Sequence, residues 1–177
     1  MNLVRYPITD FYGYKEFHRI RHYLPKLNLE NGPWIAGGSL VRLIKGLPFW
    51  NDICDDENRQ NIDIDIFFQN KEAFLKTKDN IKLIRKRCFE TENAFSFTFN
   101  FENKRHTIQC ISKYIHNNVE ELFNAFDFTV SQIATDLETV VMPDYVMDDL
   151  KNNKLILATG KYNNENFIKR VFKYAYS

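Results

Sequence analysis

The strongest constraint on the fold comes from residues 95–101, where the sequence FSFTFNF alternates between aromatic and polar residues without a break. Successive side chains of a β-strand point to opposite faces of its sheet, so this pattern fits a strand with one buried face. Asn103 and Lys104 supply a turn, and residues 107–111 (TIQCI) fit a partner strand. These features predict a β-hairpin, so the fold must contain a sheet with a core on one side.

The other segments alternate between helical and extended patterns. Apolar residues at three- and four-residue spacing predict helices, and short runs of branched or aromatic residues predict strands. The predicted helices cover residues 14–29, 39–46, 71–87, 118–125, 127–134 and 164–176, with a short one after Pro143, and the predicted strands cover 34–36, 62–68, 139–142 and 155–157. Pro25 is expected to kink or end the first helix. This order predicts an α+β fold, with a small mixed β-sheet flanked by helices and a short helical C-terminal part.

Composition narrows the class of protein. Hydrophobic residues make up 44% of the 177 residues, enough for a substantial core, and a net charge of +1 gives no global field that would attract nucleic acid. The three cysteines have no paired spacing, which favours a reducing compartment. No apolar run reaches the roughly 18 residues of a membrane span. We therefore expect a cytoplasmic protein with no membrane partner, and frequent Asn, Lys, Ile and Phe favour an AT-rich genome of viral (phage-like) or mobile origin.

Two acidic residues, Asp63 and Asp65, interrupt the apolar strand of residues 62–68 (IDIDIFF). Because they are two positions apart, both carboxylates are expected on one face of the strand, with Ile64 on the other. Two like charges this close repel, and a hard divalent cation such as Mg²⁺ or Mn²⁺ between them would remove the repulsion. Asp is also among the poorest strand formers, so the pair needs a reason. The alternative is a half-exposed strand whose acidic residues simply face water.

Gly37, Gly38 and Ser39 follow the short strand of residues 34–36 and precede a helix that ends near Gly46. Glycine lets the backbone approach a ligand closely, and the free N–H groups of a helix N-terminus bind phosphate. Ser39 is a suitable residue to cap this helix. The alternative is an ordinary tight turn. The turn lies one helix and one loop before the two aspartates, an order that would let phosphates and a metal meet at one end of the sheet.

In this order of motifs the sequence resembles the DNA polymerase β-like nucleotidyltransferase superfamily, and within it the head domain of tRNA CCA-adding enzymes and bacterial poly(A) polymerases. The resemblance runs from about residue 34 to the end of the chain. The matching features are the Gly-Gly turn, the helix ending at Gly46, Asp63-Ile64-Asp65, Asp127-Phe128-Thr129 with Ala134 further on, residues 148–151 (DDLK), residues 155–160, and the terminal helix with Lys169 and Arg170. It implies a nucleotidyltransferase-like head domain over residues 1–135, including the N-terminal helix, and a short neck-like helical extension over residues 136–177.

The resemblance also implies a chemistry. In that family two metal ions support the transfer of a nucleoside monophosphate from a nucleoside triphosphate to a hydroxyl group. By this resemblance Asp63 and Asp65 hold the Mg²⁺ or Mn²⁺ ions, and the β- and γ-phosphates bind at the glycine turn. The nucleotide-binding residues that it implies are Gly37, Gly38, Ser39, Arg42, Asp127, Lys169 and Arg170.

The sequence departs from the family pattern at several positions. The catalytic position expected for a third carboxylate, on the strand of residues 107–111, holds Gln109, whose neutral amide coordinates a metal without adding charge. Ala125 and Phe126 stand where the family has paired arginines, and Ser131 replaces an asparagine. The sequence also stops where the family's tRNA-binding body would begin, so we do not expect a standard CCA-adding enzyme.

Three functions therefore remain open. The first is a Mg²⁺-dependent nucleotidyltransferase whose acceptor is an RNA 3′ end, a protein side chain or a small molecule. The second, suggested by Gln109, is a nucleotide-binding module that has lost turnover. The third is a structural or assembly subunit that uses the fold as a scaffold, with part of its aromatic surface at a protein interface.

Overall fold

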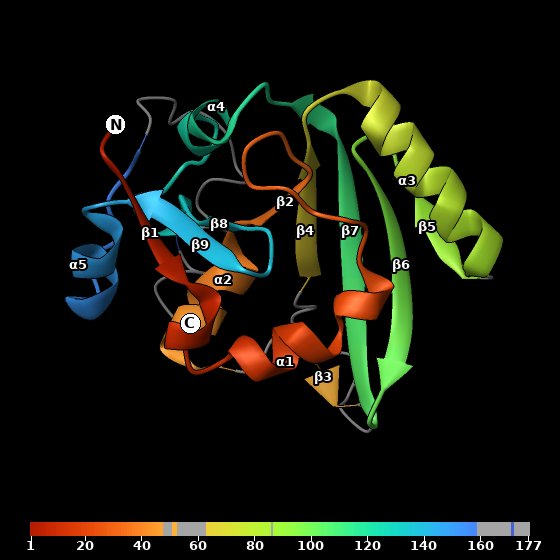
Figure 1. The fold of residues 1–177 in the computed structure, drawn as a ribbon, viewed down its shortest axis with the longest axis horizontal. Helices are drawn as coiled ribbons and strands as arrows, with labels where there is room; N and C mark the ends of the chain where they lie inside the picture. Colours follow the sequence, from red (N-terminus) through yellow and green to blue (C-terminus); the bar gives the residue numbers. More distant parts are fainter. Residues whose placement is uncertain (48–50, 53–62, 86, 159–170, 172–177) are drawn as a thin grey trace.

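The computed structural model describes residues 1–47, 51–52, 63–85, 87–158 and 171. Within them the strands are β1 (Leu3–Pro7), β2 (Trp34–Ala36), β3 (Asn51–Asp52), β4 (Asp63–Phe68), β5 (Cys88–Glu90), β6 (Ala94–Phe101), β7 (Lys104–Ile115), β8 (Ala134–Thr135) and β9 (Thr139–Pro143). They form one sheet with the order β1-β9-β8-β2-β4-β7-β6-β5, and β3 pairs with β7 (Figure 1). Among the described strands, β4 and β7 are parallel neighbours and every other pair is antiparallel, so the sheet is mixed.

Helices lie against both faces of this sheet. They are α1 (Tyr14–Arg19), α2 (Gly38–Lys45), α3 (Lys71–Ile84), α4 (Val119–Asn124) and α5 (Val146–Lys151), with 3-10 turns η1 (Ile8–Asp10), η2 (Arg21–Tyr23) and η3 (Thr129–Ser131). The larger core contains residues of α1, α2, α3 and α5 packed against one face, and a smaller core lies under α4. The predicted α+β fold, a mixed sheet flanked by helices, is confirmed.

The predicted hairpin is formed by β6 and β7. Phe95 and Phe97 are buried in the larger core, whereas Thr98 is exposed, as the alternating pattern predicts. The turn consists of Glu102 and Asn103, one residue earlier than predicted, with φ of 48° and 59°. Two central residues with positive φ match the right-handed twist of the strands that they join.

The first helix is shorter than its pattern predicts. α1 ends at Arg19, and only the 3-10 turn η2 follows it, so the prediction of a helix over residues 14–29 is wrong in its second half. Leu24 is extended, with φ of −97° and ψ of 152°. It precedes Pro25, whose ring clashes with a helical conformation of the residue before it. Pro25 therefore ends the helical stretch rather than kinking it.

The helix predicted over residues 127–134 is also wrong. Only the 3-10 turn η3 forms there, and Ala134 with Thr135 makes the strand β8, which pairs with β2 on one side and β9 on the other. Buried backbone groups of β2 and β9 need hydrogen-bonding partners, and this tertiary demand overrides the local helical pattern. The strand predicted at 155–157 is reduced to a single bridge between Phe128 and Leu157.

The proposed boundary after residue 135 stays a prediction. β9 follows that boundary but pairs with β8 and β1, which precede it. Lys169 and Arg170 of the predicted terminal helix lie outside the described residues, as do residues 53–62, which precede Asp63. Within the described part of the chain, no helix is both long enough and apolar enough to cross a membrane.

Candidate functional site

β4 carries the two aspartates on one face of the sheet. Asp63 and Asp65 are half-buried, whereas Ile64 and Ile66 have no exposed surface and belong to the larger core. This alternation follows from the two-residue period of a strand. Both carboxylates therefore leave the strand on the same side, as the sequence predicts.

Gln109 of β7 lies beside the two aspartates. In the parallel pair of β4 and β7, Asp65 is opposite Gln109 and Asp63 is opposite Thr107. The amide nitrogen Nε2 of Gln109 donates a hydrogen bond of 2.9 Å to Oδ2 of Asp63. The structure thus brings together the three residues predicted to form the catalytic group. The donor end of the amide orients Asp63, and its carbonyl end carries a neutral oxygen, an atom type that coordinates hard cations.

The glycine turn lies at the same end of the sheet as the aspartates. β2 runs antiparallel to β4 with Ile35 opposite Ile66, so the next residue of β2, Ala36, comes level with Asp65 and the turn follows at once. Gly37 has φ of 88° and ψ of −145°, a conformation that is essentially restricted to glycine. This backbone conformation explains why the turn requires glycine. The turn follows β2, the strand next to β4, which carries the two carboxylates.

Ser39 and Arg42 belong to α2, which begins at Gly38. The residue that precedes the helix as its N-cap is Gly37, so the predicted capping role of Ser39 is wrong. Ser39 is 3% exposed, and its Oγ has no hydrogen-bond partner among the described residues. Because a buried unpaired hydroxyl costs free energy, a ligand that bonded to it would be stabilised. Arg42 follows Gly38 by one helical turn and is half-buried, and this burial lowers the pKa of its guanidinium.

The segment after α4 packs against the other side of the glycine turn. The N–H of Gly37 donates a hydrogen bond of 3.1 Å to the carbonyl oxygen of Ile133. The ring of Phe126 lies 3.4 Å from the point where a Cβ atom on Gly37 would stand. Asp127, the next residue, is half-buried, and its carbonyl oxygen accepts a hydrogen bond of 2.8 Å from Ala158. The structure therefore brings the segment that contains Asp127 to the glycine turn.

Two buried polar side chains, Thr129 and Gln132, hold this segment in place. Oγ1 of Thr129 donates a hydrogen bond of 2.7 Å to Oδ2 of Asp149, which is 3% exposed on α5. Gln132 donates from Nε2 to the carbonyl oxygen of Phe123 at 2.9 Å and accepts from the hydroxyl of Tyr145 at 2.6 Å. No sequence pattern predicts these contacts. The one available signal is an isolated polar residue inside an apolar stretch, which does not identify its partner.

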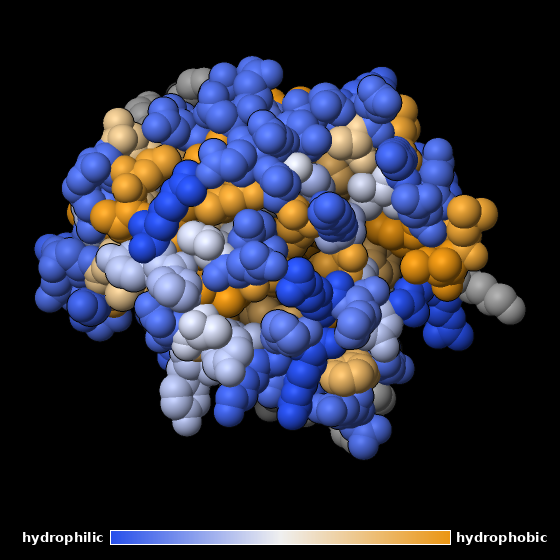
Figure 2. Space-filling view, in the orientation of Figure 1, coloured by the Kyte–Doolittle hydropathy of each residue, from blue (hydrophilic) through white to orange (hydrophobic). Residues whose placement is uncertain are grey.

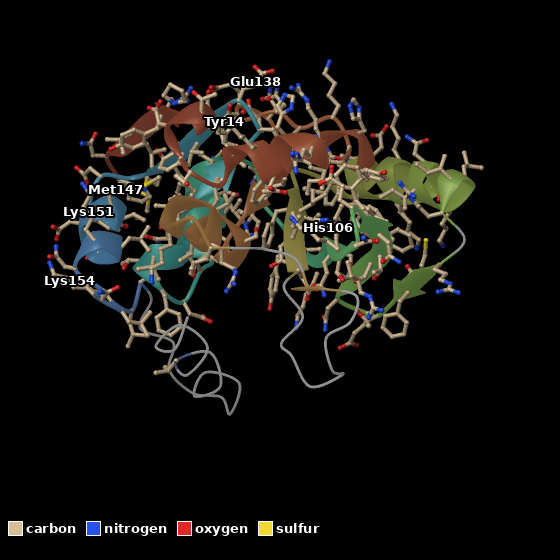
Figure 3. The ribbon with its side chains drawn as sticks, turned by 90° about the horizontal axis from the view of Figure 1, so that it is seen from below. Tyr14, His106, Glu138, Met147, Lys151 and Lys154 are labelled. Carbon is tan, nitrogen blue, oxygen red and sulfur yellow. The ribbon has the colours of Figure 1, made fainter. Side chains whose placement is uncertain are left out.

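The opposite face of β7 takes no part in the candidate site. His106, labelled in Figure 3, is three residues from Gln109 along β7, so its side chain leaves the strand on the opposite face. It is 2% exposed and stacks on Phe99, with 5.2 Å between ring centroids. Burial lowers its pKa to about 4, so the ring is uncharged at neutral pH.

The candidate metal ligands are the two carboxylates and the amide of Gln109. Over the described ranges, no group of three or more His, Cys, Asp or Glu side chains is placed to hold a metal ion. A separate cleft of about 960 Å³ lies at the far end of α2, between residues 9–16, Gly46 and Met147. Tyr14 and Met147 in its wall are labelled in Figure 3. None of the described candidate site residues lines this cleft.

Comparison with known proteins gives a family. No curated protein matches the chain. The model of the Gabija anti-defense 2 (Gad2) family proteins matches residues 14–153, a span that holds the glycine turn, both aspartates, Gln109 and Asp127. This span is most of the 177 residues. The chain therefore belongs to the Gabija anti-defense 2 family.

Proposed function

We propose that the protein is a divalent-metal-dependent nucleotidyltransferase, which transfers a nucleoside monophosphate from a nucleoside triphosphate to a hydroxyl group. The observation that carries the proposal is the position of Asp63 and Asp65, side by side on one face of β4 and one strand from the turn at Gly37. A likeness to the DNA polymerase β-like superfamily is part of the same proposal. It accounts for two aspartates within a strand where their repulsion otherwise costs free energy.

The donor set fits a hard divalent cation. Mg²⁺ and Mn²⁺ prefer oxygen ligands, which Asp63 and Asp65 supply, and such a cation, when bound, stabilises the charge that develops on a transferring phosphate. Gln109 positions Asp63 through its hydrogen bond of 2.9 Å. Because Gln109 adds no negative charge, a second cation would bind more weakly than at a site with three carboxylates. We therefore expect turnover to need a high Mg²⁺ concentration.

The glycine turn would bind the β- and γ-phosphates. The N–H groups at the start of α2, from Gly38 onward, are suited to phosphate oxygens, and the helix has the eight residues that give its N-terminus a useful dipole. The buried hydroxyl of Ser39 and the guanidinium of Arg42 are the side chains of α2 that we assign to the same phosphates. Asp127, Lys169 and Arg170 keep their predicted roles in nucleotide binding.

The family description supports a target connected with defense. It names a Gabija anti-defense 2 family protein. In our proposal the transferred nucleotide changes the charge and shape of an acceptor on which that defense depends. The acceptor is an RNA 3′ end, a protein side chain or a small molecule, and the reaction takes place in the cytoplasm, where nucleoside triphosphates and Mg²⁺ are available.

A transfer assay tests this proposal. The folded protein is incubated with each α-labelled nucleoside triphosphate, with Mg²⁺ or Mn²⁺, and with pools of RNA, protein and small hydroxylated molecules extracted from cells. We expect metal-dependent transfer of label to one pool. The variant D63N should lose it, whereas D79N, which changes an exposed carboxylate on α3, should keep it. Failure of every pool with every nucleotide would contradict the proposal.

A second candidate is a nucleotide-binding module without turnover, and the observation that favours it is Gln109 in place of a carboxylate. In that case the triphosphate and Mg²⁺ raise the melting temperature and no product forms. A scaffold that uses neither ligand is the third candidate, and its melting temperature would respond to neither.

A further inference from the structure

We propose that the outer edge of β5 binds an extended segment of a partner protein, which adds to the sheet as a strand and carries apolar and acidic side chains. β5 (Cys88–Glu90) is the last strand in the sheet order and pairs with β6 on one side. Among the described residues, no strand pairs with its other side. The backbone groups of such an edge bind an added strand, as in other cases of β-strand addition. The proposal does not depend on nucleotide transfer.

Three large apolar side chains surround this edge. Leu83 is 84% exposed, Ile84 is 69% exposed and Phe89 is 68% exposed. They fall within seven residues of sequence, at the end of α3 and on β5. Figure 2 shows hydrophobic surface gathered at this right-hand edge of the molecule, over the end of α3 and beside β5. Exposed apolar residues that cluster in this way mark interaction surfaces, whereas single ones need no explanation. We call Leu83, Ile84 and Phe89 the β5 edge cluster.

The β5 edge cluster lies on both sides of the sheet. Phe89 is opposite Ser96, and Ser96 is opposite Gln109, so Phe89 belongs to the face that carries the aspartates. Leu83 and Ile84 end α3, which packs on the other face through Phe74 and Ile81 of the larger core. An added strand directs alternate side chains to the two faces. The added strand would therefore cover apolar surface on both faces of the sheet. A ligand bound to one face would cover only part of it.

The charges at this edge favour an acidic partner. Lys82 and Arg87 are exposed in the same stretch of sequence as the β5 edge cluster, whereas the guanidinium of Arg85 lies over the ring of Tyr23, 4.7 Å from its centroid. Glu90, the one carboxylate on β5, already pairs with Lys78 and Lys82. The excess of positive charge is complementary to a segment that carries Asp or Glu beside its apolar residues.

The same features disfavour two other occupants. A second copy of this chain would bring the exposed cations Lys82 and Arg87 of both copies together, and like charges repel. A single-stranded nucleic acid would meet the cations and could stack a base on Phe89, but it would leave the aliphatic Leu83 and Ile84 uncovered. A protein segment with apolar and acidic side chains would cover the aliphatic surface and pair with the cations.

The edge also lies close to the candidate site. Phe89, Ser96, Gln109 and Asp65 form one row across β5, β6, β7 and β4. Neighbouring strands are about 4.8 Å apart, so the row from Phe89 to Asp65 spans about 14 Å. A partner held at β5 would therefore lie beside the face of the sheet that carries the aspartates.

A library selection tests the inference without knowledge of the partner. Random twelve-residue peptides displayed on particles are selected on the folded protein, and binding of the enriched peptides is measured by fluorescence anisotropy. We expect enriched peptides that alternate apolar residues with Asp or Glu and lack central proline. The variant L83S/I84S/F89S should weaken their binding by about tenfold or more. L75S, which removes a 41% exposed leucine from the same helix, should change it less than about twofold.

Further readouts separate this inference from the proposed function. Bound peptide should slow amide hydrogen exchange at residues 88–90, and D63N should bind the peptides as tightly as the unchanged protein. Equal enrichment on the unchanged protein and on the triple variant would overturn the inference. So would unchanged exchange at residues 88–90, a dimer that L83S/I84S/F89S dissociates, or displacement of the peptides by an oligonucleotide.

Discussion

The amide of Gln109 donates a 2.9 Å hydrogen bond to the carboxylate of Asp63, across two parallel strands that are 46 residues apart in sequence. Gln109 thus holds the carboxylate of Asp63 in place. Asp65 is the residue directly opposite Gln109 in the register of the two strands. In the proposed transferase, Gln109 therefore orders the metal ligands and contributes no charge to them. Substitutions at these three residues and at the glycine turn beside them should separate the effects of metal, nucleotide and packing.

Replacing either aspartate should abolish transfer with little effect on folding. D63N or D65N removes a charged metal ligand, and the loss of several kcal/mol of metal-dependent stabilisation corresponds to a rate decrease on the order of 10²-fold or more. The free energy of unfolding without metal should stay the same or rise slightly, because one of two repelling charges is gone. Transfer rates and urea unfolding of both variants, with D79N as the control, check this prediction. An active D63N/D65N double variant would be incompatible with it.

Changing Gln109 to a carboxylate should have opposite effects with and without metal. In Q109E the new carboxylate replaces the donor to Asp63, so two like charges meet and the free energy of unfolding should fall by about 1–2 kcal/mol. Added Mg²⁺ should restore it, and transfer at limiting Mg²⁺ should rise. Q109A should lose about 1 kcal/mol without Mg²⁺, because the hydrogen bond to Asp63 is removed, and Mg²⁺ should restore less stability than in Q109E, since alanine supplies no ligand oxygen. Thermal unfolding with and without Mg²⁺ distinguishes the two variants, and equal behaviour would count against the metal site.

The backbone of Gly37 should tolerate no side chain. At φ of 88° and ψ of −145°, an alanine is strained, and its Cβ would stand 3.4 Å from the ring of Phe126. We expect G37A to lower the free energy of unfolding by about 2–3 kcal/mol and to remove the thermal stabilisation by nucleotide and Mg²⁺. Gly46 is a matched control, because its φ of 67° and ψ of 24° lie in the left-handed helical region. G46A should cost about 1 kcal/mol and preserve the nucleotide response.

The buried bond between Thr129 and Asp149 should matter for stability. T129V keeps the shape of the side chain and removes the donor to a carboxylate that is 3% exposed. A hydrogen bond to a charged group contributes about 1.5–3 kcal/mol, so unfolding should require that much less free energy. T98V is the control, since the contact of Thr98 with Thr107 is 3.5 Å long and exposed. Urea unfolding at pH 7 measures the free energy of unfolding of both variants. Equal decreases in T129V and T98V would show that the buried hydrogen bond stabilises the protein no more than the exposed contact does.

Acid should destabilise the protein through His106. Its pKa is about 4 in the folded chain, below the ordinary value of 6.5, because the ring is buried and close to Lys104. The unfolded chain therefore binds more protons between these values, so stability is full above pH 6.5 and falls as the pH drops toward 4. A pKa difference of one between the folded and unfolded chain corresponds to about 1.4 kcal/mol, so His106 accounts for about 3 kcal/mol at most. H106F, which keeps a ring against Phe99, should lose this dependence. Unfolding series at pH 7 and pH 4.5 compare the two proteins, and parallel pH profiles would exclude this role.

The sequence predicts best where one local rule decides the structure. Alternation was sufficient for β4 and β6, where each buried side chain is two residues from the next. Local rules failed where distant residues decide. β8 forms because β2 and β9 lie on either side of it, although its own sequence has a helical pattern.

The same distinction applies to the candidate site, where local patterns predict some features and long-range contacts decide the others. The spacing of Asp63 and Asp65 fixes their common face, and a glycine pair between a strand and a helix marks the turn. The hydrogen bond between Gln109 and Asp63 depends on the register of two parallel strands, which no local pattern encodes. The contact of Thr129 with Asp149 depends likewise on how α5 packs.

The most direct test of the transferase proposal is a crystal structure with a non-hydrolysable nucleoside triphosphate and Mn²⁺, in which anomalous scattering locates the metal. We predict Mn²⁺ at about 2 Å from oxygens of both Asp63 and Asp65, with the β- and γ-phosphates at the N–H groups that begin α2. Mn²⁺ and phosphates bound elsewhere, for example in the cleft lined by Tyr14 and Met147, with the two carboxylates unligated, would contradict the account.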